Sequence, residues 1–139
     1  MKISRPLLDE LLEHVLGDRR NEICGVVAVD GEDGSAETAS ATRVYRAANV
    51  HASPMRFEIE PAELLAMHDD IEARGWRIGG IYHSHVRSRP YPSQTDVNFA
   101  ANWPGVEWII VGLASGPEPD VHSYLIEGGA VREVALEVG

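Results

Sequence analysis

The sequence has little with which to form disulfides or to enter a membrane. Its 139 residues include one cysteine, Cys24, so no disulfide framework can form within the chain, and a single free thiol fits a reducing cytoplasm. No apolar run approaches the roughly 20 residues that span a bilayer. The opening residues, Met-Lys-Ile-Ser-Arg-Pro, lack the apolar core of a signal peptide. We therefore expect a cytoplasmic protein with no membrane partner.

Positive charge is also scarce. The chain has 12 lysine and arginine residues against 22 aspartate and glutamate residues, a net charge of -10 at pH 7. A protein that follows nucleic-acid phosphates needs a basic face, and a helix that lies on a membrane surface needs a basic stripe. The composition therefore argues against both partners. A chain of this length is expected to form one domain, over residues 1–139, that buries roughly 70% of the surface of the unfolded chain.

Hydrophobic periodicity predicts two longer helices and one short one. Leucine and valine recur at steps of three and four over residues 6–17, with Pro6 at the start and Gly17 at the end. The same signals predict a helix over 61–74 and a short helix near 94–102. Apolar or alternating runs predict strands at 23–29, 37–47, 55–59, 76–83, 107–113, 120–126 and 131–137, the last two joined by a Gly-Gly turn. The expected fold class is α/β (α+β), a central mixed β-sheet flanked by two longer helices and one short helix.

The most informative segment for chemistry follows the strand predicted at 76–83. His83 and His85 are two residues apart, and side chains at this spacing on an extended strand point to the same side. Asp96 follows in the first turn of the short helix. Two imidazoles and one carboxylate are a familiar ligand set for catalytic zinc, which leaves a fourth position for water. Zinc lowers the pKa of such a water towards ~7.

Each part of this segment also has a structural interpretation. A His-x-His pair on a strand is more often simply exposed, and Ser93-Gln-Thr-Asp96 has the pattern of a helix capping box. The combination of a strand ending in His-Ser-His, a proline-stiffened loop and Ser-x-x-Asp is far more restrictive than either part. Neither a His-Glu-x-x-His helix nor a Pro-Cys-x-x-Cys pair is present, which excludes two other zinc templates. The segment therefore favours a metal site.

A zinc hydrolase also needs a general base. Glu22, just before the first apolar strand, is well placed, although a solvated acid at a helix–strand junction is the ordinary alternative. Spacing alone does not separate Glu22 from Glu58 or Glu60. A cysteine nucleophile is disfavoured, because Cys24 lies within an apolar strand, where thiols are usually inert.

These motifs together resemble a known signature. Glu22-Ile-Cys24-Gly25, then His83-Ser84-His85, seven residues, and Ser93-x-x-Asp96 is similar to the JAMM (MPN+) metalloprotease motif, in its short prokaryotic type. One position departs: the family usually has proline after the second histidine, where this chain has Val86. Because that residue is not a ligand, the departure concerns the shape of the loop and not zinc binding.

The resemblance implies a JAMM/MPN-like fold and one Zn²⁺ per chain. Carried over by residue, it implies that His83, His85 and Asp96 bind the zinc. Glu22 would act as general base and acid through the zinc-bound water, and Ser93 would help to stabilise the oxyanion. Ser84, between the histidines, points to the opposite face of the strand and is expected to orient structure.

Enzymes of this family typically cleave the peptide or isopeptide bond after the Gly-Gly tail of a ubiquitin-like protein. The short prokaryotic type implies a small β-grasp partner: a sulfur carrier that releases cysteine, or a modifier linked to lysine, which the motif does not separate. The tail would pair with edges at 54–59, which includes Phe57, and at 86–92. Arg87 and Arg89 would hold an acidic partner or a substrate carboxylate, although arginine in a polar loop is usually only solvated.

Two other classes of function remain open. One is a zinc hydrolase of a small-molecule amide. The other is a non-catalytic MPN scaffold, which is disfavoured because such members usually lack ligands that this chain keeps. The oligomeric state, monomer or homodimer, is left open by the sequence.

Overall fold

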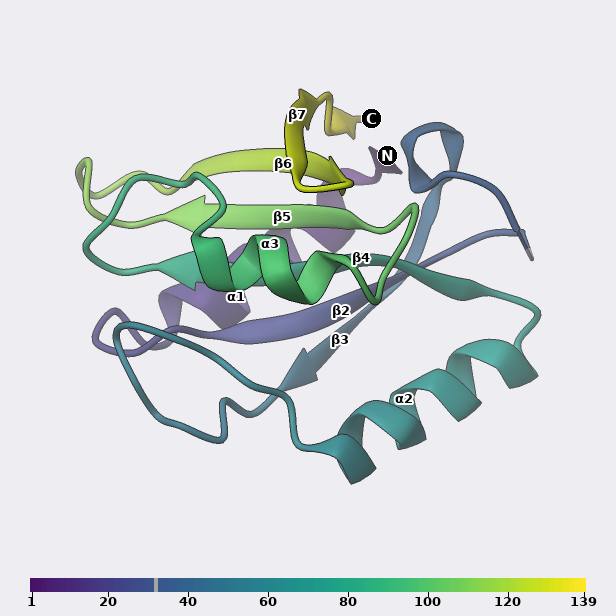
Figure 1. Cartoon of the computed structure of the whole chain (residues 1–139), viewed down its shortest axis with the longest axis horizontal. Helices are drawn as coiled ribbons and strands as arrows, with labels where there is room; N and C mark the ends of the chain where they lie inside the picture. Colours follow the sequence, from purple (N-terminus) through teal and green to yellow (C-terminus); the bar gives the residue numbers. More distant parts are fainter. Residues whose placement is uncertain (32) are drawn as a thin grey trace.

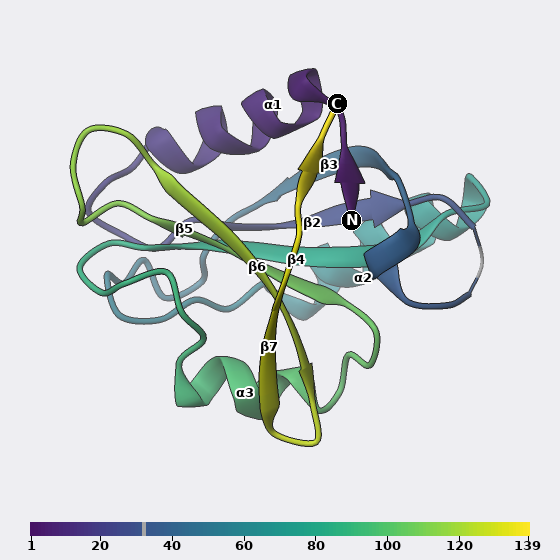
Figure 2. The same ribbon diagram turned by 90° about the horizontal axis from the view of Figure 1, so that it is seen from above.

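The fold is a β-sheet with helices on both faces (Figure 1; Figure 2). The computed structural model describes residues 1–31 and 33–139. The helices are α1 (Arg5–Leu16), α2 (Pro61–Ala73) and α3 (Gln94–Ala100), with a 3-10 turn, η1 (Ala36–Thr38). The strands are β1 (Lys2–Ile3), β2 (Cys24–Val29), β3 (Ala41–Ala47), β4 (Arg77–His85), β5 (Glu107–Gly112), β6 (Asp120–Glu127), β7 (Ala130–Val134) and β8 (Glu137–Val138). None of the helices in the described part of the chain is long and apolar enough to cross a membrane.

The main sheet is mixed, which confirms the predicted class. Its strand order is β3-β2-β4-β5-β6-β7, with β4 and β5 parallel and every other neighbouring pair antiparallel. Helix α1 covers one face, and α2 and α3 cover the other, as Figure 2 shows for α1 and α3 on opposite sides of the sheet. The central strands are therefore buried on both faces, and this explains their nearly continuous apolar sequence.

Alternation along the strands divides the core into its two sides. On β2, Val27 and Val29 pack under α1, whereas Val26 and Ala28 pack under α2. On β5, Ile109 belongs to the α1 side, and its neighbours in the chain face α3. Side chains one residue apart on these strands thus serve different layers, as the pleat requires.

Four of the predicted strands differ from the structure. The strand predicted at 37–47 starts only at Ala41, because residues 36–38 form the 3-10 turn η1. Residues 55–59 form no strand: their ladder contact is a single bridge between Asn49 and Ile59, and side-chain hydrogen bonds hold the segment instead. The strand predicted at 131–137 is divided into β7 and β8. The short β8 pairs in parallel with β1, and this two-stranded sheet was not predicted because two residues give no measurable alternation. The strand predicted at 76–83 runs on to His85.

The extension of β4 determines where its last residues lie. His83 pairs with Cys24 at the start of β2, and His85 pairs with Gly112 at the end of β5. The following loop is packed onto the sheet, because the Pro90 ring lies in the space left by the missing side chain of Gly112. The carboxyl end of β4 therefore meets the start of β2 and the residues leading into α3 at one edge.

Candidate active site

Two histidines from β4 form the floor of the site. Both are buried, and their Nε2 atoms are 3.1 Å apart, because residues two apart on a strand share a face. The other ring nitrogen of His85, Nδ1, donates to the carbonyl oxygen of Arg89 at 2.8 Å. This bond orients the ring and leaves Nε2 as the nitrogen with a free lone pair. The ring of His83 is held by stacking on Phe57, at a centroid distance of 4.4 Å.

Asp96 reaches the histidines from the first turn of α3. Its Oδ2 lies 3.2 Å from His83 Nε2 and 3.6 Å from His85 Nε2. The same oxygen accepts the Ser93 N–H at 2.9 Å, while Ser93 Oγ accepts the Asp96 N–H at 3.1 Å. The tetrapeptide is thus a capping box, and this cap is what aims the carboxylate at the two imidazoles.

The electrostatics of this group fit a bound cation. Burial raises the pKa of Asp96, but the two histidines and the Ser93 N–H together lower it well below its usual range. Burial lowers the pKa of His83, which favours the neutral ring that binds metals. Burial also acts to lower the pKa of His85, but hydrogen bonding to Asp96 and to the Arg89 carbonyl raises it overall. Two ring nitrogens and a carboxylate oxygen that face one another at 3.1 to 3.6 Å are a donor set suited to Zn²⁺.

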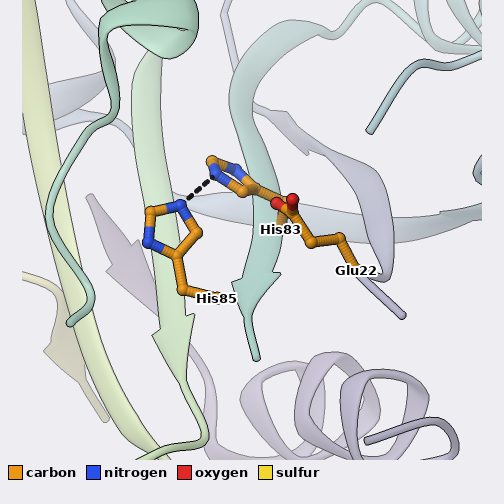
Figure 3. A group of neighbouring side chains, drawn as sticks. All are labelled: Glu22, His83 and His85. Carbon is orange, nitrogen blue, oxygen red and sulfur yellow. Dashed lines mark hydrogen bonds between the residues drawn. The ribbon is translucent and has the colours of Figure 1, made fainter. Parts of the chain in front are cut away.

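Glu22, in the segment just before β2, lies beside the two histidines, as Figure 3 shows. A carboxylate oxygen of Glu22 and one nitrogen of each histidine all lie within 4.8 Å of one another. Its side chain is buried, and burial raises its pKa to about 7, with Asp96 adding to the rise and His85 opposing it. A carboxyl group with this pKa can accept and release a proton near neutral pH.

Two carboxylates are thus available to complete a metal site with the histidines. Asp96 presents one oxygen within 3.6 Å of both Nε2 atoms and is fixed by the cap. Glu22 is less closely placed: its carboxylate oxygen and the histidine nitrogens lie within 4.8 Å of one another. The geometry therefore favours Asp96 as the ligand and Glu22 as the free acid–base group.

Two polar residues hold the backbone around Glu22. The Ile23 N–H donates to Ser84 Oγ at 2.9 Å, and the Ser84 N–H donates to the Ile23 carbonyl at 3.0 Å. Ser84 therefore lies on the face of β4 away from the imidazoles and fastens the neighbour of Glu22 to the strand that carries them. The expectation that Ser84 orients structure agrees with these contacts.

Asn49 is a second anchor, and sequence reasoning missed it. Its Nδ2 donates to the carbonyl oxygens of Glu22 at 3.1 Å and Arg56 at 2.9 Å. Its Oδ1 accepts the N–H groups of His51 and Glu58, each at 3.1 Å. One side chain thus joins the backbone of Glu22 to the segment at 54–59. No spacing rule identifies it, since an asparagine in a loop ordinarily caps only its own turn.

A cleft of about 210 Å³ lies beside Glu22, His85 and Asp96. It is lined by the side chains and backbone of Glu22, Pro54, Met55, Arg56, Phe57, His85, Arg87, Ser88, Ser93, Thr95 and Asp96. Of the predicted substrate residues, Phe57 and Arg87 line the cleft. Arg89 is not among its lining residues: its guanidinium lies over the Tyr91 ring, 4.6 Å from the centroid.

The remaining nucleophile near the site is Cys24. Its side chain is fully buried, and burial, with smaller contributions from two glutamates, raises the pKa of the thiol to about 12. A thiol in this state is a packing residue, because the thiolate is the reactive form.

Comparison with known proteins gives the family. Residues 4–127 match the family model described as prokaryotic homologs of the JAB domain. The chain is 32% identical over 143 residues to the desampylase of Haloferax volcanii. This alignment covers 99% of this chain and 96% of the relative. It is 30% identical over 136 residues to the CysO-cysteine peptidase of Mycobacterium tuberculosis, with 98% and 89% covered.

Solved structures show the same fold. A solution structure of a Desulfitobacterium hafniense protein has a TM-score of 0.84 and 28% identity, and the match covers 99% of this chain and 92% of that one. A structure described as a JAMM metalloprotease-like zinc site has a TM-score of 0.59 and 23% identity, with 100% and 97% covered. The chain therefore belongs to the JAMM (MPN+) family, in its short prokaryotic type, and is a hydrolase of that family.

Proposed function

We propose that this protein is a zinc-dependent peptidase that hydrolyses the bond after the C-terminal Gly-Gly of a ubiquitin-like or sulfur-carrier protein. The group released would be cysteine or a lysine-linked target. Relatives that align over nearly the whole chain support this class of reaction, since they are named desampylase and CysO-cysteine peptidase. We further propose that residues 1–139 act as one catalytic domain in the cytoplasm.

The observation that carries the proposal is the placement of Glu22 beside the His83, His85 and Asp96 group. Four ionisable side chains from three separate segments converge at one end of a buried strand, and all four are buried. Burying such groups is costly unless they are paired, hydrogen-bonded or bound to a metal. This placement supports a catalytic role for the site more than that of a scaffold.

In this proposal each side chain has a separate task. His83 Nε2, His85 Nε2 and Asp96 Oδ2 would hold Zn²⁺, which when bound supplies Lewis-acid chemistry at the scissile carbonyl. Glu22 would accept a proton from the attacking water and deliver it to the leaving nitrogen as the C–N bond breaks. The carbonyl carbon keeps the oxygen of the water, and the amine leaves with the proton.

Ser93 would assist at the same carbonyl. Its Oγ accepts the Asp96 N–H, which leaves its own O–H free to donate, and Ser93 lines the cleft. A donor aimed at an oxygen that gains negative charge in the transition state lowers the barrier. Phe57, which stacks on His83, also lines the cleft. A tail that ends in two glycines has no side chains to collide with it.

The test is intact-mass spectrometry of a β-grasp carrier bearing a C-terminal Gly-Gly-Cys, and of the same carrier joined through Gly-Gly to a lysine side chain. Zinc-loaded wild-type protein should remove the group after Gly-Gly from at least one of the two. Glu22→Gln should keep the zinc and lose most turnover. Glu58→Gln is the matched control, because Glu58 lies outside the cleft, paired with His51 at 2.9 Å.

Two results would contradict the proposal. Unchanged masses for both substrates, with zinc bound, would point to a non-protein amide as the substrate. Full turnover by Glu22→Gln would remove Glu22 from its role as the base.

A further inference from the structure

The cleft carries positive charge that the proposed hydrolysis does not use. Arg56 lines it from the segment at 54–59, and Arg87 lines it from the loop at 86–92. The chain as a whole has a net charge of -10. Two guanidinium groups line the same small cleft as the carboxyl groups of Glu22 and Asp96, and a guanidinium without a protein partner can pair with an anionic group of a ligand.

Most arginine side chains elsewhere have partners. Carboxylates pair with Arg5, Arg46, Arg74 and Arg132. Backbone carbonyls accept from Arg19 and Arg77. Aromatic rings lie under Arg43 and Arg89. Within residues 1–31 and 33–139, only Arg20, Arg56 and Arg87 have a guanidinium with none of these contacts. Two of these three line the catalytic cleft.

The backbone at both cleft arginines is anchored. The Arg56 carbonyl accepts from Asn49 Nδ2 at 2.9 Å. Arg87 lies between His85 and Arg89, which are joined by the 2.8 Å bond from the His85 ring to the Arg89 carbonyl. Both residues are exposed, and each side chain extends from a segment that these bonds hold. A guanidinium group offers paired N–H donors that match the two oxygens of a carboxylate.

We propose that Arg56 and Arg87 bind the free α-carboxylate of the residue that follows Gly-Gly. The enzyme would then prefer a C-terminal α-peptide bond, which releases a free amino acid, over a lysine isopeptide bond. This inference rests on the proposed hydrolysis and selects between its two substrate classes.

The covalent structure of the two substrates gives the reason. In an α-peptide, the carboxylate is attached to the carbon that bears the leaving nitrogen, so it enters the cleft together with the scissile bond. In a lysine isopeptide, the leaving nitrogen ends a four-carbon chain that carries no carboxylate. Glu22 and Asp96 also face this cleft, and their negative charge would repel an incoming carboxylate unless cations offset it.

The test compares two substrates that differ only in charge: the carrier ending in Gly-Gly-Cys with a free carboxylate, and the same carrier ending in a Cys carboxamide. Hydrogen bonds to a charged group contribute about 1.5–3 kcal/mol, so wild-type kcat/KM should be about 10- to 100-fold higher for the acid. Arg56→Gln and Arg87→Gln should each lower kcat/KM for the acid, mainly through KM, and leave the amide nearly unaffected. Arg5→Gln, which removes the same charge on α1, should keep the wild-type ratio.

A binding measurement gives an independent readout. Titration calorimetry of the Glu22→Gln protein should show tighter binding of the acid than of the amide, and Arg87→Gln on that background should remove the difference. Equal cleavage and equal binding of acid and amide would overturn this inference alone. A loss in the arginine variants that is equal for both substrates would also overturn it, since the arginines would then contact the body of the carrier. Cleavage of neither substrate, with the lysine-linked carrier still cleaved, would also overturn this inference alone. Cleavage of none of the three would overturn the proposed function, and this inference with it.

Discussion

Replacing Asn49 by aspartate should loosen the wall of the cleft while the core stays intact. The two side chains have the same shape, so the acceptor oxygen that holds the His51 and Glu58 N–H groups is kept. The amide nitrogen is replaced by a second oxygen. The donor bonds to the Glu22 and Arg56 carbonyls, at 3.1 and 2.9 Å, are therefore lost and become contacts between oxygens.

The expected loss follows from those two bonds. Each contributes about 1 kcal/mol net, and the side chain is only half-buried, so repulsion between the oxygens adds little. We expect Asn49→Asp to lower the free energy of unfolding by about 2 kcal/mol in urea titrations with an unchanged slope. Asn98→Asp is the control: Asn98, on exposed α3 surface, accepts one bond from Gln94 at 3.0 Å, which aspartate can also accept. Its expected change is within about 0.5 kcal/mol.

The same variant tests whether Asn49 positions the base. Because Asn49 holds the backbone of Glu22 and not a zinc ligand, Asn49→Asp should keep one zinc per chain and lose kcat. The reasoning would be refuted if Asn49→Asp were as stable as Asn98→Asp, or if it lost its zinc while the rest of the protein stayed folded.

Three further predictions concern the packing and the charges around the site. Gly25→Ala would place a Cβ 2.3 Å from ring atoms of the buried Tyr82, and should destabilise the protein by about 1–3 kcal/mol in the same urea assay; a neutral effect would mean that the ring moves freely. Glu107→Ala would leave the buried Met1 ammonium, now 2.7 Å from Glu107, without its ion pair, and should cost about 3–5 kcal/mol. In chelator-treated protein, the buried Glu22 has a pKa of about 7 in the folded state against 4.5 ordinarily. Its folded form therefore binds more protons than its unfolded form in this window, and wild-type stability should fall relative to Glu22→Gln as pH rises from about 4.5 to 7. A constant difference across that range would contradict the raised pKa.

Much of the fold is encoded in local patterns. The apolar runs of β2, β4 and β5 predict central strands because both of their faces are buried. The Gly128-Gly129 turn is encoded as well, since both residues have positive φ, at 57° and 80°, as a two-residue hairpin turn requires. Residues 55–59 alternate like a strand, yet the Asn49 side chain bonds the Arg56 carbonyl and the Glu58 N–H in place of a neighbouring strand. A competitor from another segment leaves no trace in the local pattern.

In the candidate site, too, some residues are predictable from the local sequence and others are not. The His83, His85 and Asp96 group depends on short-range geometry, a strand pair and a helix cap, and spacing alone suggests it. The partners of Asn49 are as much as 27 residues away in the chain, and only the tertiary structure brings them together. Which arginines line the cleft is also decided by packing: Arg89 lies over the Tyr91 ring and is not a lining residue, whereas Arg56, from the segment at 54–59, is one.

The central claim is that His83, His85 and Asp96 hold one zinc ion while Glu22 stays free as the base. An anomalous difference map at the zinc absorption edge, from crystals of the zinc-loaded protein, tests it most directly. We predict one peak per chain, about 2.0–2.2 Å from His83 Nε2, His85 Nε2 and an Asp96 carboxylate oxygen, with Glu22 beyond bonding distance. A peak bound by Glu22 in place of Asp96, or no peak between the histidines, would contradict the account.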